Sequence, residues 1–419
     1  MVNSEIYYNQ LQKKYSRSIT LGLSRIKKAL SLLDNPHLKL ANPINIIGSD
    51  GKFTCLESIS SFIQADKKTT TKFISPHLVN LQSRMWLKNR FISINEIKKY
   101  EKKISKLNIK LSLFEVLTLI YLLAAAKERA DYQCVEAGLL FRGDSTRLWK
   151  KPFLQVCTNL NKQHLEWVYP KTINEICRQK VGYMSNNTNI YIGKQNPKVL
   201  KIVKKILRKN KSNIYYPNSW KIIKVGKDLF YKDRQNQIKI KSKYIHSKGL
   251  IDNLGLAIKI ALDLKIKPKV IQKTIPKIKF EGRLEYIKKG KLRGHLNKNE
   301  KLLIDGAHSN ASAQNLRNYL KNINGPIYGI WGMQKNKMPK KFINNFKGIF
   351  KKIITLKIPS EPNSCSAEEL KNILYNKGYT KVASAESILG SFKKVSNKTK
   401  KTIVVFGSLY LCGEFLKRN

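Results

Sequence analysis

The stretch that decides the fold is Pro43-Ile44-Asn45-Ile46-Ile47-Gly48-Ser49-Asp50-Gly51-Lys52-Phe53-Thr54. Its first five residues are rich in β-branched side chains and end at a glycine, which predicts a short buried strand. Apolar residues at helical spacing follow from Thr54 to Ile63. Strand, glycine-rich loop and helix in succession predict the beginning of an α/β domain with a mostly parallel sheet.

The loop in this stretch has the spacing GxxGKxT, which is shorter than the phosphate-loop fingerprint GxxxxGK[ST]. Backbone N–H groups at such a helix start can cradle phosphate, Lys52 adds a positive charge, and the Thr54 hydroxyl suits Mg²⁺. A glycine-rich turn between strand and helix is also common in α/β folds. The loop alone therefore leaves a phosphate site and an ordinary turn both open.

Strands and helices alternate along most of the chain. Near the start of the chain, apolar residues at helical spacing from Leu21 to Leu33 predict a helix. The lysine-rich stretch 194–243 predicts strands. The other expected helices cover residues 113–126, 173–180, 249–264 and 311–320. The other expected strands cover residues 132–136, 153–159, 302–305, 327–331, 353–356 and 402–406. With a boundary near Phe280-Glu281-Gly282-Arg283, the pattern predicts two α/β domains of unequal size.

The net charge is +54, from 81 Lys and Arg residues against 27 Asp and Glu residues. Such a balance suits a nucleic-acid-binding protein, but 67 of the 81 are lysines and they are spread over the whole chain. Nucleic-acid sites concentrate charge on one face and favour arginine. We therefore favour a compositional drift toward Lys, Ile and Asn, and we do not expect nucleic acid as a partner.

Neither cysteine spacing nor hydropathy indicates a special compartment. The six cysteines form no CxxC pair and sit beside apolar residues, so we expect small buried side chains rather than a zinc or redox site. No apolar run approaches the length of a membrane span, and the N-terminal segment has no export signal. We expect a cytoplasmic protein without a membrane partner.

Three further side chains follow predicted strands or close a helix. Glu136 ends the strand at 132–136, His164 follows the strand at 153–159, and Lys180 closes the helix at 173–180. Ligands of open α/β sheets gather at the carboxyl ends of the strands, and an acid there suits Mg²⁺. A single histidine is more often a surface or core residue than a ligand, so His164 carries weight only in combination with the others.

The order and spacing of many short motifs resemble the bifunctional dihydrofolate synthase/folylpolyglutamate synthase family, which is related to the peptidoglycan Mur ligases. The resemblance covers nearly the whole chain. It is carried by the segments Gly22-Leu23-Ser24-Arg25, the phosphate loop, Ser75-Pro76-His77-Leu78, Phe114-Glu115, the Glu136 segment, Gln179-Lys180-Val181-Gly182, Gly282-Arg283-Leu284-Glu285, Asp305-Gly306-Ala307-His308 and Gly407-Ser408-Leu409-Tyr410.

The resemblance implies an α/β fold of two domains. Residues 1–282 would form a P-loop NTPase-like domain that binds ATP and the pterin or folate, and residues 283–419 would form a smaller Rossmann-like glutamate-ligase domain. The implied reaction joins L-glutamate to dihydropteroate or to the glutamyl tail of a reduced folate. ATP first phosphorylates the carboxylate, because an unmodified carboxylate repels the amine and has no leaving group. The cofactors would be ATP and Mg²⁺, and the protein would be a monomer.

The resemblance also implies roles for individual residues. Lys52, Lys180 and His164 would act in catalysis, and Lys180 matches the lysine that is carbamylated in the family. Nucleotide would contact Gly48, Asp50, Gly51, Lys52, Phe53, Thr54, Asn253, Arg283, Asp305 and His308, with the smaller domain closing over the larger. The metal would be held by Thr54, Ser75, Glu136 and His164. The acid substrate would contact Gly22, Leu23, Ser24, Arg25, Ser112, Leu113, Phe114, Glu115, Gly143, Asp144, Ser145 and Ser408.

Each assignment has a plainer structural interpretation. Asp305 before Gly306 suits the turn that ends a strand, and Arg283 suits a solvated surface charge. Phe114 lies in an apolar helix and suits the core. The Ser75-Pro76 pair suits a loop.

The chain departs from the family pattern near the expected site. Asp50 and Phe53 stand where Asn and Gly are usual, and Gln163 stands where Asp precedes the metal histidine. Residues 140–147 replace a Gly-Gly-Arg-Leu-Asp-Ala-Thr-Asn run, and Asn336 and Met338 replace an acid pair. Changes in the support of metal ligands can lower affinity or activity roughly 10- to 100-fold. Three hypotheses stay open: an active folate-pathway ligase, a related ligase for another acid, and an impaired homologue that binds through its basic surface.

Overall fold

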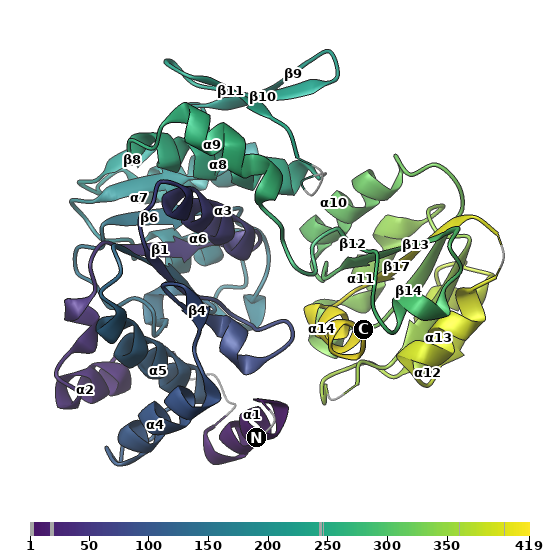
Figure 1. The fold of residues 1–419 in the computed structure, drawn as a ribbon, viewed down its shortest axis with the longest axis horizontal. Helices are drawn as coiled ribbons and strands as arrows, with labels where there is room; N and C mark the ends of the chain where they lie inside the picture. Colours follow the sequence, from purple (N-terminus) through teal and green to yellow (C-terminus); the bar gives the residue numbers. More distant parts are fainter. Residues whose placement is uncertain (1–3, 17–20, 243–244, 246, 360, 398) are drawn as a thin grey trace. The chain divides into compact units, whose positions relative to one another are not determined.

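The computed structural model describes residues 4–16, 21–242, 245, 247–359, 361–397 and 399–419. These residues form two compact units. The first takes residues up to 242 and residues 250–278, and the second takes residues 279–419 with residues 245 and 247–249 (Figure 1). The expected α/β class with two mostly parallel sheets is confirmed. The functional division into residues 1–282 and 283–419 stays a prediction.

The main sheet of the first unit has eight strands in the order β4-β3-β2-β5-β1-β6-β7-β8. Strands β2, β5, β1, β6, β7 and β8 run parallel, while β3 and β4 are antiparallel additions at one edge. The strands are β1 (Pro43–Ile47), β2 (Thr70–Phe73), β3 (Met85–Leu87), β4 (Arg90–Phe91), β5 (Tyr132–Glu136), β6 (Leu154–Cys157), β7 (Asn189–Ile192) and β8 (Asn213–Tyr215). The bounds predicted from sequence for β1 and β5 are confirmed residue for residue.

Helices cover both faces of this sheet. Side chains such as Phe73, Val135 and Ile190 pack under α1 (Ser4–Lys14), α2 (Ser24–Leu32), α4 (Ile94–Ser105), α5 (Leu113–Glu128), α6 (Ile173–Val181) and α7 (Pro197–Leu207). The other face carries α3 (Lys52–Ala65), which contacts α9 (Pro268–Thr274). Right-handed crossovers put α3 and α6 on opposite faces, because the chain leaves β1 and β6 toward opposite edges of the sheet. A crevice for ligands forms where such connections diverge.

One predicted segment is partly wrong. Residues 194–243 were expected to form strands, but they begin with the helix α7, which Asn196 caps and Pro197 starts. Its apolar residues face the sheet, and its lysines lie on the other side, so a lysine-rich composition hides a helical period. Strands follow only afterwards, as β8 and the antiparallel ribbon β9 (Lys221–Val225), β10 (Asp228–Lys232) and β11 (Gln237–Ile240). The predicted helix after the ribbon is α8 (Lys248–Asp263).

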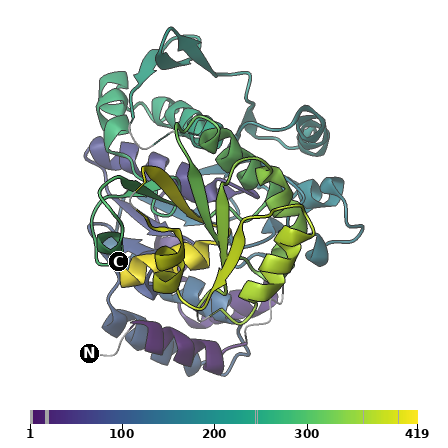
Figure 2. The same cartoon turned by 90° about the vertical axis from the view of Figure 1, so that its right-hand side faces the viewer.

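The second unit contains a six-stranded sheet in the order β12-β13-β17-β14-β15-β16, in which only β12 is antiparallel (Figure 2). Its strands are β12 (Glu285–Ile287), β13 (Glu300–Asp305), β14 (Ile327–Trp331), β15 (Lys352–Leu356), β16 (Val382–Ala385) and β17 (Lys401–Phe406). Its helices are α10 (Asn310–Leu320), α11 (Pro339–Ile343), α12 (Ala367–Tyr375), α13 (Ile388–Val395) and α14 (Leu409–Arg418). Every strand and helix predicted here is present, and β12, β16 and helices α11 to α14 are additional.

The cysteines lie in the interior of the protein. All six are free and buried, as predicted. Burial raises the pKa of Cys177 to about 11, so this thiol stays protonated and behaves as a small apolar group. Within the described ranges, no helix combines the length and apolar character needed to cross a membrane.

Candidate active site at the phosphate loop

The loop between β1 and α3 needs two residues without a side chain, because Thr158 packs against Gly48 and Asn253 packs against Gly51. Gly48 and Gly51 have φ angles of 145° and 86°, a region that L side chains rarely adopt. A Cβ atom on Gly48 would lie 2.0 Å from Thr158 Oγ1. Gly51 caps α3 without a side-chain hydrogen bond, so the first amides of the helix have no side-chain cap and point toward the loop. The loop therefore has the glycine-rich backbone and the open helix start that a phosphate site requires, and phosphate binding stays a prediction.

Lys52, Glu136 and Ser75 come together from the ends of three neighbouring strands. Lys52 Nζ lies 3.7 Å from Glu136 Oε1, and both side chains are largely buried. The backbone N–H of Ser75 donates to Glu136 Oε2 at 3.4 Å. Arg84 Nη1 donates to Ser75 Oγ at 3.3 Å. A cation, a carboxylate and a hydroxyl therefore converge beside the phosphate cradle.

Thr54 occupies the first turn of α3. Its hydroxyl donates to the Gly51 carbonyl at 2.9 Å and accepts from Asn253 Nδ2 at 3.0 Å. Asn253 comes from α8, so the structure joins two predicted nucleotide contacts in one unit. Phe53, beside Thr54, is half-buried.

His164 lies in the loop after β6. Its backbone is left-handed, with φ 61°, and its ring Nδ1 lies 3.9 Å from Glu166 Oε1. The residue before it, Gln163, donates from Nε2 to Asp50 Oδ1 at 2.9 Å, which brings this loop onto the phosphate loop. A role of the His164 ring as a metal ligand stays a prediction.

The donor set suits a hard divalent cation. Glu136 and Ser75 supply oxygen, and the hydroxyl of Thr54 lies on the neighbouring helix turn. Among the residues that the structure describes, no three His, Cys, Asp or Glu side chains gather as a metal cluster. A metal at this place would therefore need oxygens from hydroxyl groups or from a bound phosphate, as Mg²⁺ commonly does.

Lys180 is fully buried next to the loop. Its Nζ donates to the carbonyl oxygens of Gly48 at 3.0 Å and Leu139 at 2.5 Å. Burial, followed by the positive charge of Lys52, lowers the pKa of Lys180 to about 7. A large fraction of this amine is therefore neutral near pH 7, which makes it a nucleophile rather than a fixed cation.

The three predicted substrate segments of the first unit converge. Gly22 N donates to Gly143 O at 3.1 Å, and Arg25 Nη2 lies 3.2 Å from Glu115 Oε1. Thr118 and Ser145 share a hydroxyl hydrogen bond at 2.8 Å. The remaining members of these segments are Leu23, Ser24, Ser112, Leu113, Phe114 and Asp144.

Some of these residues have a clear structural role. Ser112 caps α5 and bonds to Glu115, while the Asp144 carboxylate accepts from the N–H groups of Leu139 and Thr146. Phe114 is partly buried against the core, as its plainer interpretation expected, and its ring fills the space above Gly138. Contact with a substrate stays a prediction for the whole set.

Four predicted residues lie in the second unit at the carboxyl ends of β13 and β17, which are neighbours. Asp305 accepts from Leu284 N at 2.9 Å and from Ala307 N at 2.8 Å, which ties the segment of Arg283 to the strand end. Burial raises the pKa of Asp305, and the positive charge of Arg283 partly offsets that effect. His308 Nδ1 bonds to the Gly306 carbonyl at 2.8 Å, and Ser408 caps α14. Their contact with nucleotide or substrate stays a prediction.

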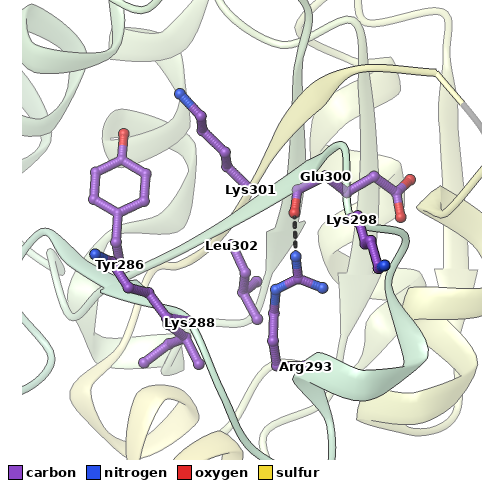
Figure 3. Close-up of a pocket in the computed structure, with 8 residues that line it drawn as sticks. Tyr286, Lys288, Arg293, Lys298, Glu300, Lys301 and Leu302 are labelled. Carbon is purple, nitrogen blue, oxygen red and sulfur yellow. Dashed lines mark hydrogen bonds between the residues drawn. The ribbon is translucent and has the colours of Figure 1, made fainter.

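The second unit also holds a cavity of about 380 Å³ beside β12 and β13 (Figure 3). Arg293 lies in it and donates to the carbonyl oxygens of Leu296 and Glu300, at 3.0 and 2.9 Å. These bonds fasten the turn between the two strands. None of the predicted site residues lines this cavity.

Three contributors to the phosphate-loop site were not predicted. Thr158 bonds to the carbonyl of Asp50, Asn161 bonds to the Asp50 carboxylate, and Arg84 bonds to Ser75. Thr158 lies near the end of the strand predicted at 153–159 and Asn161 follows that strand, so their position at a strand end was an available signal. Arg84 follows no motif, and only the folded chain brings it to Ser75.

Comparison with known proteins agrees with this fold. The family described as dihydrofolate synthetase, C-terminal domain, matches residues 288–418. The chain is 27% identical to the dihydrofolate synthetase of Saccharomyces cerevisiae, over 96% of this chain and 98% of the relative. The structure of E. coli FolC with DHPP and ADP has a TM-score of 0.86 at 19% identity, covering 99% and 97% of the two chains. The Yersinia pestis bifunctional folylpolyglutamate synthase/dihydrofolate synthase with AMPPNP and Mn has a TM-score of 0.85 at 19% identity, with the same coverage.

Fold and site together define a two-unit α/β protein with a phosphate loop in the first unit and a C-terminal unit of the dihydrofolate synthetase type. The family model over the C-terminal unit and the relatives that match nearly the whole chain support the resemblance to the dihydrofolate synthase/folylpolyglutamate synthase family.

Proposed function

We propose that this protein is an ATP-dependent ligase that joins L-glutamate to dihydropteroate, to the glutamyl tail of a reduced folate, or to both. One observation carries the proposal: Lys52 Nζ lies 3.7 Å from Glu136 Oε1 beside a glycine cradle at the end of β1. Phosphoryl transfer needs positioned positive charge more than it needs a nucleophilic side chain. The names of the relatives indicate which acid and which amine take part.

The chemistry needs two steps. The γ-phosphoryl group of ATP passes to a carboxylate oxygen of the acid, which gives an acyl phosphate and ADP. The amine of glutamate attacks the acyl carbon, loses a proton, and expels inorganic phosphate as the amide forms. Lys52 would hold the β- and γ-phosphates and neutralise the charge that develops on the transferred group.

Glu136 and Ser75 would hold Mg²⁺, with Thr54 and His164 as the other predicted ligands. The ion, when bound, neutralises phosphate charge and polarises the oxygens of the transferred group. Lys52 and Glu136 form an ion pair across 3.7 Å. If Glu136 bound Mg²⁺ instead, the ammonium group of Lys52 would be available for phosphate. Asn253 keeps the Thr54 hydroxyl in place through their hydrogen bond.

We also propose that Lys180 is carbamylated. The neutral amine attacks CO₂, and loss of a proton leaves a carbamate anion in place of a cation. A pKa of about 7 supplies that neutral amine at physiological pH. Mass spectrometry of the intact protein under bicarbonate, with Lys180→Met as the control, would detect the added group.

The test of the function is ADP release with dihydropteroate and with a reduced folate, each with and without glutamate. We expect ADP release to require both an acid and glutamate. Release without glutamate, or none with either acid, would contradict the proposal. A cytoplasmic location and a monomeric state stay predictions.

A second candidate is the same chemistry on a different acid. Arg142 and Arg147 lie over the same Tyr183 ring, at 5.5 and 5.3 Å from its centre, beside the predicted substrate segment. Burial lowers the pKa of Arg147, and the nearby charge of Arg142 adds to that effect. Two guanidinium groups so close together favour a more anionic substrate. A panel of pterin, folate and peptidoglycan-precursor acids would separate the two candidates.

If no acid supports ADP release, the basic-surface hypothesis replaces both. It requires retention on DNA that falls steeply with salt concentration, together with no ATP turnover.

A further inference from the structure

The phosphate loop is fastened to the loop of His164 through one carboxylate. Asn161 Nδ2 donates to Asp50 Oδ2 at 2.6 Å, and Gln163 Nε2 donates to Asp50 Oδ1 at 2.9 Å. Both oxygens of Asp50 therefore accept from amides of the same loop. We refer to Asp50, Asn161 and Gln163 as the Asp50 clamp.

Backbone bonds hold the two loops in register around the clamp. The N–H groups of Ser49 and Asp50 donate to the Asn159 carbonyl at 2.7 and 3.3 Å. Asn161 N donates to Ser49 Oγ at 3.1 Å, and Thr158 Oγ1 donates to the Asp50 carbonyl at 2.8 Å. The clamp is therefore part of a continuous contact between the carboxyl ends of β1 and β6.

The clamp also explains how the phosphate loop accommodates the negative charge of Asp50. A carboxylate in a phosphate loop repels phosphate, and hydrogen-bond donors that stabilise the charge and orient it away from the loop weaken that repulsion. Here two amide donors hold it on the side of the β6 loop. Asp50 and Gln163 are both departures from the family pattern, and the structure joins them by one hydrogen bond.

We propose that Asp50 is a positioning residue that fixes the His164 loop against the phosphate loop through its carboxylate–amide pair with Gln163. The inference rests on the proposed function, because it assigns the clamp a part in nucleotide binding. Hydrogen bonding needs one acceptor and one donor at this contact but does not require that position 50 be the acceptor. An amide at position 50 and a carboxylate at position 163 would make the same bond with the same total charge.

Two single variants and their combination test the clamp. Asp50→Asn removes the charge of the acceptor. Its new NH₂ group can bond to Gln163 only if the Gln163 amide turns its oxygen inward, which replaces a charge-assisted bond with a weaker amide–amide bond. Gln163→Glu keeps the length of the side chain, places two carboxylates in contact and repels more strongly. In the double variant D50N/Q163E, the amide oxygen introduced at position 50 accepts from Asn161, and its NH₂ group donates to the carboxylate introduced at position 163. Complementarity is thereby restored.

The measurements are the KM for ATP in glutamate-dependent ADP release, the Kd for ADP by calorimetry in EDTA, and the Tm. Removing a hydrogen bond to a charged group costs about 10-fold or more in an equilibrium constant, so we expect D50N to raise both constants about 10-fold. We expect Q163E to raise them further and the double variant to recover most of the loss. Asp233→Asn is the matched control, because Asp233 also accepts from an amide, Asn236, but in the turn between β10 and β11. It should lower the Tm without changing either constant.

The proposal is overturned if the effects of the two substitutions simply add in the double variant. It is also overturned if every variant lowers the Tm while the KM for ATP and the Kd for ADP stay at wild-type values, since that would be a purely structural role. Wild-type protein without glutamate-dependent ADP release would contradict the proposed function. The Kd for ADP in EDTA would still test the clamp.

Discussion

The side chain of Lys180 donates a hydrogen bond from Nζ to the carbonyl oxygen of Gly48 at 3.0 Å. This bond ties the end of α6 to the first residue of the phosphate loop, on the face of the sheet opposite α3. The buried amine is therefore part of the phosphate-loop end of the first unit, and its charge state can affect the stability of that loop.

Lys180 should give the protein a characteristic pH dependence of stability. Burial lowers its pKa from the ordinary lysine value of 10.5 to about 7, so between these values the unfolded chain binds the extra proton. Stability contributed at this position therefore rises with pH through that window. We expect the Tm of wild type to rise relative to the Tm of Lys180→Met as the pH increases from 7 toward 10. A difference that stays constant or moves the other way would contradict the lowered pKa.

Lys52→Met should abolish turnover and leave the fold intact. Removal of a group that stabilises transferred charge typically lowers kcat about 100-fold or more. Lys72→Met is the matched control, because Lys72 is equally buried in the same unit and pairs with Glu57. We expect Lys72→Met to lower the Tm and keep ADP release. A comparable fall of kcat in both variants would contradict a specific role of Lys52 in turnover.

Gly48→Ala should strongly lower nucleotide affinity, because there is no space for the new methyl group. Its Cβ would lie 2.0 Å from Thr158 Oγ1, and φ 145° is a strained value for alanine. Gly226→Ala serves as the control, since Gly226 also has a positive φ but no atom within 4 Å of the added Cβ. Nucleotide affinity, measured by calorimetry, should fall for Gly48→Ala and stay unchanged for Gly226→Ala.

The second unit contains a fully buried ion pair whose loss should destabilise it. Lys401 Nζ lies 3.2 Å from Glu300 Oε1, and both side chains are inaccessible. Removing one partner of a buried pair costs about 3–5 kcal/mol, so Lys401→Met should lower the free energy of unfolding by that amount. The exposed pair Lys239–Asp228 is the control, and Lys239→Met should cost about 1 kcal/mol or less. Denaturant unfolding of both variants measures the contrast.

The same pair predicts a loss of stability in acid. Burial raises the pKa of Glu300, but hydrogen bonds from Asn397, Ser396 and Asn297 outweigh it and leave the pKa lowered. A carboxyl group with a lowered pKa stabilises the fold above its ordinary value of 4.5 and loses that contribution as pH falls. The Glu300→Gln variant should show a smaller decline in Tm on acidification. An equal decline would assign the acid sensitivity to other carboxyl groups.

Local pattern was sufficient for two of the strands that carry the site. Strands β1 and β5, like β14 in the second unit, were predicted with their observed bounds, because each is a short apolar run between polar or glycine-containing segments. Strand β2, which leads to Ser75, was not predicted. The pattern failed at α7, where lysines on the exposed face obscured an apolar stripe of helical period. It also did not reveal α11 to α14.

What the sequence by itself determined is the α/β class, the strands and helices with a clear apolar period, the phosphate loop and the residue types beside it, since these depend on near neighbours along the chain. Only the tertiary structure decided that Lys52 meets Glu136, that Asp50 bonds to Gln163, and that Lys180 is buried. Such contacts join residues from different strand ends, and their energies depend on distance and on exclusion of water. Neither quantity is present in a sequence until the sheet has brought its strand ends together.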